Sequence, residues 1–496
     1  MEESKKGFSQ ILKATSIFGG VQIVTIFFSI IRTKFAAVLL GPAGMGIVGL
    51  FSSTIDFFGA ATNFGLSTAG VRSLAEVSND ENQVKTGRTI SIVKNLVWIT
   101  GFLGLVVLIL CSPVLSKWIF GSSDYTWGFI ALSITLLFNQ LLAARMVLIQ
   151  GLRRLSLLAL IYIVNAVSSV IITVPLYYFL GERGIVPALI LISLFGFLVS
   201  YYFSRRVSYA KINVGWLESL NEGREMLKLG FFIGLSGLLT LASAYLLRIF
   251  INNVGSLEDV GLYNAGFAIL NTYVGLVFTA MATDYFPRLS SNSGNIKAFS
   301  QVANQQLEVA ILLLGPILCW FMIFINPIIV VLYSEDFRPI NEMLLWSGFG
   351  MLFKGIGWCL GYVILAKGSS RFFFINELIA LGYQLVFNLL GYYFFGLKGL
   401  GVSFLVGYLC YSIQVILVSS NKYQYEFERD IITKFMILFG FLAICMCCFY
   451  YMENPILKYA VGTGVSIVAS LYTLKELDKS TDLLIKARKK FSDKFL

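Results

Sequence analysis

The sequence has no histidine, and only 13% of its 496 residues are charged. Histidine is the side chain that titrates nearest to neutral pH and a common metal ligand, so its absence excludes histidine-based catalysis and histidine-ligated metals. The seven cysteines all lie in apolar stretches, where cysteine is usually a small buried hydrophobic residue. A P-loop of the form G-x-x-x-x-G-K-[ST] is also missing. We therefore expect no catalytic residues, no metal and no cofactor.

Apolar residues dominate instead, at 57% of the chain with a mean hydropathy of +0.79. This composition excludes a soluble enzyme. Stretches long enough to cross about 30 Å of hydrocarbon lie at roughly 13–38, 43–68, 90–111, 127–150, 156–179, 185–204, 229–254, 262–286, 305–333, 341–366, 373–395, 400–419, 435–451 and 456–473. The sequence thus predicts an all-α integral membrane protein with about 14 transmembrane helices, of which the last two follow a core of twelve.

The net charge of +11 is explained by where the cations lie between the predicted spans. If the N-terminus is cytoplasmic, 28 Lys and Arg fall on cytoplasmic segments and four fall outside, at Lys117, Arg183, Arg338 and Lys398. Cytoplasmic loops of membrane proteins retain Lys and Arg in this way. The pattern predicts that both termini are cytoplasmic, and it accounts for the basic excess without a nucleic-acid partner. The N-terminal span lacks a small-residue cleavage site, so we expect it to be an anchor and not a removed signal.

The chain repeats itself with an offset of about 215 residues. The segment Tyr177–Gly184 recurs as Tyr392–Gly399, and Gly46 matches Gly261. Six helices in each repeat give two lobes of the same orientation, an arrangement typical of transporters. The expected organisation is an N-lobe at 1–204, a basic cytoplasmic linker at 205–228, a C-lobe at 229–420, two further helices at 421–474 and a basic cytoplasmic tail at 475–496.

Ionisable residues within the predicted spans are candidates for the functional site, because each is costly in hydrocarbon unless it faces protein or water. Arg32 and Arg248 are 216 positions apart, close to the repeat offset, and Lys354 lies near the centre of its span. We expect these three to line a cavity. Arg145 and Lys34 could do the same or could extend to the headgroup layer, and Lys458 is expected to extend there.

Fewer anionic and amide side chains lie within the spans. Asp56 is the deep carboxylate, and it either pairs with a cavity cation or couples transport to a proton or sodium gradient. Glu377 is a second candidate for pairing or coupling, at the start of its span. Asn264 and Asn271 offer hydrogen bonds that suit hydroxyl-rich sugars or contacts between helices.

These features favour a transporter of something anionic over an integral-membrane enzyme. A glycan-processing membrane enzyme generally needs an extramembrane loop with carboxylates or a metal, whereas the predicted outside loops here are short, roughly 4 to 16 residues. An ion-coupled exporter of small amphiphiles is the alternative transporter, but cationic cargo would suit a cavity rich in carboxylates.

Several stretches of the sequence form a recognisable pattern: Lys34 with Leu40–Gly46 (LGPAGMG), Gly65–Arg72 (GLSTAGVR), Glu258–Ala265 (EDVGLYNA), Tyr285–Ser290 (YFPRLS) and Trp346–Lys354. In these stretches the sequence resembles the O-antigen and polysaccharide-repeat flippases (Wzx type) of the MOP superfamily, which includes MATE exporters and lipid II flippases. The resemblance spans about residues 10 to 420. The family pattern has Gln and Asp where this chain has Ser347 and Met351, so one carboxylate near Lys354 is absent.

The resemblance implies a MOP-type bundle of two six-helix lobes around a cationic cavity that alternates between the membrane faces. It implies a multi-pass protein of the cell inner membrane that moves an undecaprenyl-diphosphate-linked oligosaccharide to the periplasmic leaflet during lipopolysaccharide or other polysaccharide biosynthesis. Arg32, Lys34, Arg248 and Lys354 match basic positions of the family and would hold the diphosphate. The implied partners are the lipid-linked oligosaccharide, membrane lipids, and a polysaccharide polymerase with its chain-length machinery.

Overall fold

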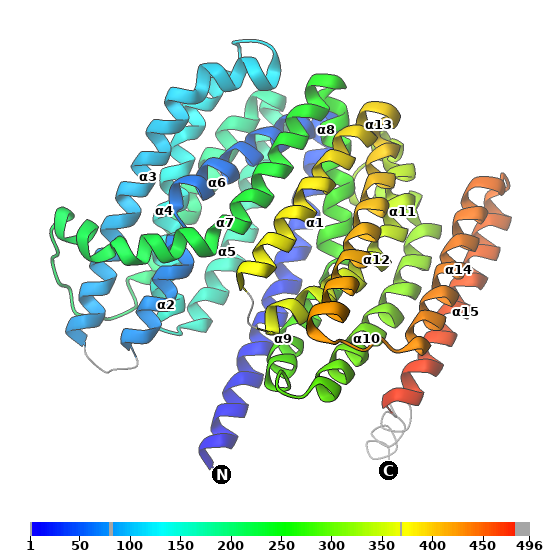
Figure 1. Cartoon of the computed structure of the whole chain (residues 1–496). Helices are drawn as coiled ribbons and strands as arrows, with labels where there is room; N and C mark the ends of the chain where they lie inside the picture. The colour runs from blue at the N-terminus through cyan, green and yellow to red at the C-terminus, as the bar shows by residue number, and fades with distance from the viewer. Residues whose placement is uncertain (1, 79–82, 368–369, 482–496) are drawn as a thin grey trace, which may run out of the picture. The chain divides into compact units, whose positions relative to one another are not determined.

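The computed structural model describes residues 2–78, 83–367 and 370–481, and nearly all of them are helical (Figure 1). Ten helices of this described part are long and apolar enough to cross a membrane. Three of them, Gly20–Asn63, Leu155–Ser204 and Arg371–Tyr423, each cover most or all of two predicted spans. A further predicted span, 262–286, is a helix interrupted by a π-helix. All fourteen predicted spans are therefore helical, which confirms the predicted fold class.

The described chain divides into two compact units. The first comprises residues 1–261 with 332–334, and the second comprises 262–331 with 335–496. The helices of the first unit are α1 (Glu2–Asn63), α2 (Leu66–Ser78), α3 (Gln83–Phe120), α4 (Thr126–Gly151), α5 (Leu155–Leu180), η1 (Gly181–Gly184), α6 (Ile185–Ser204) and α7 (Trp216–Val254), together with the start of α8 (Leu257–Ala268).

The second unit continues from α8 into the C-terminal helices. Its elements are the π-helix η2 (Ile269–Val274), α9 (Leu276–Ser291), α10 (Ile296–Ile323), α11 (Ile325–Leu332), η3 (Glu335–Ile340), α12 (Asn341–Ala366), α13 (Ser370–Tyr423), α14 (Arg429–Tyr451) and α15 (Pro455–Thr481). The packed core of this unit is formed chiefly by α10, α12 and α13, with Leu312, Leu360 and Val415 fully buried. The predicted lobe boundaries stay a prediction, and α7 lies in the first unit.

Glycine and proline set the kinks inside the long helices. Within α1, Gly41 has φ 64° and ψ −174°, and Pro42 follows it. Only glycine adopts such backbone angles without strain, and proline removes an amide donor, so the helix changes direction between the two predicted spans. The next span, 43–68, ends earlier than predicted because Phe64 and Gly65 have φ values of 51° and 62°. The chain then restarts as α2 at Leu66.

The linker predicted at 205–228 is only partly a loop. Helix α7 already begins at Trp216 and changes direction along its length (Figure 1). Its first turns are attached to α3 because Arg88 bonds to Glu218 and Glu222, with 3.0 Å between Arg88 Nε and Glu222 Oε2. The predicted span 305–333 is also divided, since α10 ends at Ile323 and α11 begins at Ile325.

The repeat found in the sequence is visible in the local geometry. Gly181 and Gly396 are equivalent under the 215-residue offset, and both have left-handed backbone angles, with φ 55° and ψ −135° against φ 58° and ψ −142°. Three residues later, a Cβ at Gly184 would overlap the carbonyl of Leu176, and a Cβ at the equivalent Gly399 would overlap the carbonyl of Gly391. The same turn is thus built twice from equivalent residues.

The equivalent glycines Gly46 and Gly261 also meet each other, where α1 crosses α8. A Cβ at Gly46 would overlap the carbonyl oxygen of Leu257, and a Cβ at Gly261 would overlap that of Pro42. Pro42 and Leu257 are themselves equivalent under the repeat. The contact is therefore self-complementary, as in an interface between two-fold related copies. Small residues at such a crossing let two helix backbones approach closely.

One buried lysine links the terminal pair α14 and α15 to α10. Lys434 of α14 lies 2.5 Å from Glu308 of α10, 2.6 Å from Asp430 and 3.7 Å from Glu476 of α15. The side chains of Lys434, Glu308 and Glu476 are only 10, 15 and 13% exposed. Glu308 thereby has a cationic partner.

Candidate functional site

Two predicted site residues of the first unit, Asp56 and Arg248, lie close together. Asp56 follows the kink of α1, and Arg248 is its electrostatic partner from the end of α7. Asp56 is exposed, whereas Arg248 is half-buried and donates from Nη1 to the carbonyl of Ala244 at 2.9 Å. Both roles foreseen for Asp56, charge pairing with a cation and ion coupling, stay predictions.

A polar contact one turn away supports this pair. The Thr54 hydroxyl donates to the Tyr245 hydroxyl at 2.9 Å, and the Tyr245 ring stacks on Phe57 at 5.5 Å between centroids. Thr54 and Tyr245 are both buried. Residues three and four apart share a helix face, so Tyr245 and Arg248 face the same side of α7. This contact fixes the register of α1 against α7 and hence the positions of the two charges.

Arg32 and Lys34 lie before the kink of α1 and have other neighbours. Both are half-buried. Tyr177 of α5 is the electrostatic neighbour of the Arg32 guanidinium. The Lys34 ammonium donates to the backbone carbonyl of Tyr333, which belongs to the first unit. Each of the two cations thus lies near a neutral oxygen-bearing group.

In the second unit, Lys354 and Asn271 form a direct pair. Lys354 Nζ on α12 donates to Asn271 Oδ1 at 2.9 Å. The ammonium also lies 5.4 Å from the ring centroid of Tyr408 and 5.8 Å from that of Phe404, both on α13. These distances are within the range of cation–π attraction. Lys354 therefore contacts a neutral amide and two aromatic rings.

Asn271 reaches Lys354 from the π-helix η2, between α8 and α9. A π-helix inserts an extra residue per turn and is found frequently at functional sites. Asn264 lies two turns earlier, on α8, and is half-buried. The π-helix sets the direction of the Asn271 side chain. The apolar pattern of residues 262–286 does not predict this interruption of the helix.

Glu377 lies at a different place in the second unit. Its carboxylate accepts a hydrogen bond from the Tyr411 hydroxyl. It lines a cavity of about 260 Å³ together with Trp358, Tyr362 and Phe373. A carboxylate among aromatic rings can hold a proton, a cation or a sugar ring, so the geometry leaves both pairing and coupling open for Glu377.

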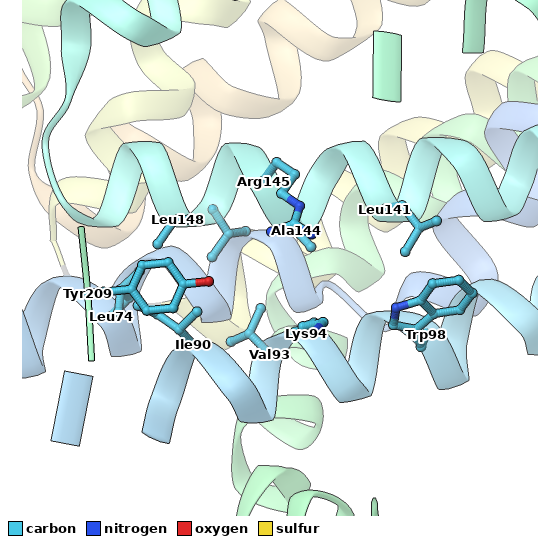
Figure 2. A pocket seen from close by; sticks show the side chains of 11 residues that line it. Leu74, Ile90, Val93, Lys94, Trp98, Leu141, Ala144, Arg145, Leu148 and Tyr209 are labelled. Atoms are coloured by element: carbon cyan, nitrogen blue, oxygen red, sulfur yellow. The ribbon is translucent and has the colours of Figure 1, made fainter. Parts of the chain in front are cut away.

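Arg145 lies apart from the other predicted site residues. It extends from α4 over the ring of Tyr201 of α6, with 5.0 Å from Cζ to the ring centroid. Figure 2 shows it lining a small cavity with Lys94 of α3 and Tyr209. The structure thus gathers the predicted residues into an Asp56–Arg248 pair, a Lys354–Asn271 pair, and separate positions for Arg32, Lys34, Glu377 and Arg145.

The sequence did not indicate which tyrosines lie near the predicted site residues. Tyr177, Tyr408 and Tyr411 each lie beside a predicted site residue, and Tyr245 stacks on Phe57, the chain neighbour of Asp56. Tyrosine is also common in interfacial belts, so its abundance alone did not distinguish them. Spacing along the sequence could have indicated Tyr245, because it precedes Arg248 by three residues and so lies on the same face of the helix.

The fold of this chain is shared with membrane transport proteins. The fold matches that of the lipid II flippase MurJ in an inward closed conformation, with a TM-score of 0.68, 16% identity and coverage of 95% of this chain and 100% of the other. An inward-facing multidrug MATE transporter of the MOP superfamily gives a TM-score of 0.65 at 15% identity, over 84% of this chain and 95% of the other.

A more specific assignment comes from the sequence family. The model described as "Polysaccharide biosynthesis protein" matches residues 36–342, and the chain belongs to this family. A similar curated protein is the lipid III flippase of Escherichia coli (strain K12), 22% identical over 376 residues that cover 74% of this chain and 87% of that protein. The lipid III flippase of Shigella flexneri matches equally well. The chain is thus a multi-pass membrane protein of this family, and it shares its fold with transporters of the MOP superfamily.

Proposed function

We propose that this protein is a flippase for a lipid-linked oligosaccharide and moves it from the cytoplasmic to the periplasmic leaflet of the inner membrane by alternating access. The family, the lipid III flippase relatives and the shared fold with a lipid II flippase support this class of substrate. The observation that carries the proposal is that each unit holds a deep cation, Arg248 in the first and Lys354 in the second, on a membrane-spanning helix.

The proposed ligand of these cations is the diphosphate of an undecaprenyl carrier. Arg248 and Arg32 offer planar guanidinium groups suited to bidentate phosphate binding, and Lys34 and Lys354 offer compact charges. Among the described residues, no carboxylate within 4.0 Å pairs with Lys354, whose hydrogen-bond partner is the neutral Asn271. A phosphate oxygen can therefore replace Asn271 at the ammonium without breaking an ion pair.

The sugar part of the proposed substrate is an O-antigen or related surface-polysaccharide repeat. Asn264, Asn271 and Tyr408 beside Lys354 supply hydrogen bonds and an aromatic face for hydroxyl-rich rings. Oligosaccharide that has crossed the membrane would pass to a polysaccharide polymerase and its chain-length machinery. This step places the protein between assembly of the repeat unit and its polymerisation.

Ion coupling is proposed at the carboxylates. Asp56 lies beside Arg248, so protonation of Asp56 would release the guanidinium for the diphosphate. Glu377, bonded to Tyr411, is the second candidate for a proton or sodium ion. No cofactor is needed in this scheme, because an ion gradient or the substrate gradient would drive the cycle.

The test is a leaflet-accessibility assay in proteoliposomes with an undecaprenyl-diphosphate-linked oligosaccharide. We expect wild-type protein to translocate the substrate, and Arg248→Ala and Lys354→Ala to reduce the rate about tenfold or more, since a hydrogen bond to a charged group contributes about 1.5 to 3 kcal/mol. Lys117→Ala and Arg154→Ala remove exposed cations elsewhere and serve as matched controls.

Each outcome has a clear meaning. Translocation that both variants retain would contradict the diphosphate role of Arg248 and Lys354 while leaving the flippase class standing. An absence of translocation for several glycans, with and without proton or sodium gradients, would overturn the flippase proposal. Ion-dependent transport of a small amphiphile by the same preparation would then favour the exporter.

A further inference from the structure

A second group of cations surrounds a polar cavity in the first unit. The cavity has a volume of about 390 Å³ and lies between α3, α4, α6 and the segment that follows α6. Four of its lining residues are basic, and none is acidic: Lys94, Arg145, Arg205 and Lys211. None of these four forms an ion pair with a carboxylate of the described chain. Within the described chain, no carboxylate therefore neutralises their charge.

Tyr201 holds part of this cluster in place. Arg205 Nη2 donates to the Tyr201 hydroxyl at 2.7 Å, and its guanidinium lies 4.5 Å from the ring centroid. Arg145 approaches the same ring at 5.0 Å, and Lys94 is a further electrostatic neighbour of the Tyr201 hydroxyl. Like charges gathered around one ring repel each other, so a bound counter-charge would stabilise the arrangement.

The segment carrying Lys211 is fixed against α3. The Ser91 hydroxyl donates to the carbonyl of Ile212, and Asn95 Nδ2 donates to the carbonyl of Val214 at 2.9 Å. A Cβ at Gly87 would overlap the carbonyl of Ala210, so the two backbones are in close contact. These bonds hold the fourth wall of the cavity in place. A preorganised wall lowers the entropic cost of binding.

The cavity also adjoins apolar surface. It shares Ile90, Lys94, Arg145 and Tyr209 with the narrow cavity of Figure 2. The other lining of that cavity is apolar and includes Trp98, one helical turn beyond Lys94 and partly exposed. Tryptophan beside basic residues is typical of the membrane–water interface. The cluster also lies at the end of the helices that the cation pattern predicts to be cytoplasmic.

We propose that this cavity, lined by Lys94, Arg145, Arg205 and Lys211, binds the phosphate group of a lipid headgroup at the cytoplasmic interface. Guanidinium and ammonium donors suit a phosphate, and the adjacent apolar surface suits the lipid that carries it. This site is separate from Arg248 and Asp56 and does not rest on the proposed transport activity. The headgroup could be that of an anionic phospholipid or the diphosphate of a polyprenyl lipid.

The experiment measures lipid binding to the purified full-length protein in detergent. The probes are short-chain phosphatidylglycerol, undecaprenyl diphosphate, phosphatidylcholine and inorganic phosphate. We expect phosphatidylglycerol or undecaprenyl diphosphate to bind, and the Lys94→Gln/Arg145→Gln double variant to bind that lipid about tenfold more weakly. Thermal unfolding of each variant verifies that it is folded.

Arg206→Gln is the matched control. Arg206 neighbours Arg205 but lies over the rings of Tyr202 and Phe203, and it does not line the cavity. Equal loss of binding in Arg206→Gln and in the double variant would overturn the proposal, because nonspecific surface charge would then explain the effect. Undiminished binding by the double variant, or inorganic phosphate competing as well as the lipid does, would also overturn it.

The probes identify the source of the phosphate. If only undecaprenyl diphosphate depends on Lys94 and Arg145, the cavity is a first docking position for the polyprenyl carrier. If phosphatidylglycerol depends on them, the cavity anchors the first unit to anionic membrane lipid. Loss of translocation in Arg248→Ala with unchanged lipid binding would keep this site distinct from the proposed transport site.

Discussion

Lys434 and Lys354 lie in similar apolar helices but have opposite surroundings. Lys434 contacts three carboxylates, whereas Lys354 contacts an amide and two aromatic rings. A lysine paired with carboxylates is electrostatically satisfied and holds helices together. A lysine with only neutral partners still carries a charge that a ligand can satisfy. This difference is the basis for assigning Lys434 to stability and Lys354 to binding.

Lys434→Met should destabilise the protein by about 3 to 5 kcal/mol, the usual cost of removing one partner from a buried ion pair. The reason is that Glu308 and Glu476 lose the cation they share. The exposed Lys479, 2.6 Å from Glu476, is the control, and Lys479→Met should cost about 0 to 1 kcal/mol. Denaturant unfolding of the purified protein measures both. Similar values for the two variants would contradict the structural role of Lys434.

Lys354→Arg should retain more translocation than Lys354→Met, because arginine keeps the charge and methionine keeps only the length of the side chain. Asn271→Leu should have a smaller effect than Lys354→Met, since it removes the resting partner of Lys354 and leaves the charge. Initial flipping rates in proteoliposomes measure the series. Equal activity of Lys354→Met and wild type would remove Lys354 from the binding site.

At the level of elements, small residues decide how closely the helices pack. Gly46 and Gly261 allow α1 and α8 to touch backbone to backbone. Substitution by valine would require the two helices to separate, and such overpacking usually costs about 1 to 3 kcal/mol or more. The contact is self-complementary, so Gly46→Val and Gly261→Val should cause similar losses.

Gly20→Ala is the control for this crossing. Gly20 lies on the same helix α1 and has nothing within 4 Å of a Cβ position. Thermal unfolding in detergent should show a lower Tm for both valine variants and an unchanged or higher Tm for Gly20→Ala. A wild-type Tm for Gly46→Val would mean that α1 and α8 do not cross this closely.

The turns at Gly181 and Gly396 give a separate prediction. Neither glycine has an atom within 4 Å of a Cβ position, but both have left-handed backbone angles. Alanine therefore fits in space but is strained, by roughly 1 to 2 kcal/mol. Gly382→Ala, in the regular part of α13, should instead stabilise by up to about 1 kcal/mol. Chemical unfolding of the three variants distinguishes strain from crowding, and equal effects would contradict the assigned angles.

At the level of the whole molecule, the distribution of Lys and Arg predicts the orientation in the membrane. A cysteine at Ser208, in the exposed segment after α6, should react with a membrane-impermeant thiol reagent only from the cytoplasmic side. A cysteine at Ser123, between α3 and α4, should react only from the opposite side. The parent protein without either substitution controls for native cysteines such as the exposed Cys447. Reversed labelling would overturn the predicted topology.

Much of the fold could be predicted because the membrane restricts what a chain can do. Each span must satisfy its own backbone hydrogen bonds, so apolar stretches of sufficient length become helices. The repeat at Gly181 and Gly396 could also be found, since equivalent turns need glycine in both copies. For the candidate site, the sequence predicted individual charged residues but not which residues lie beside them. Their neighbours, such as Tyr411 beside Glu377, come from distant parts of the chain and leave no local signal.

The sequence by itself determined that the protein is a helical membrane protein, which residues carry charge within the spans, and that its two halves are related. Hydropathy, charge and glycine positions are local properties, and the lipid environment converts them directly into structure. The tertiary structure alone decided which charges meet. It paired Asp56 with Arg248 and Lys354 with Asn271, and it grouped Arg145 with Lys94 in a separate basic cavity. These contacts depend on helix rotation, kinks and crossings, which follow from packing between segments far apart in the chain.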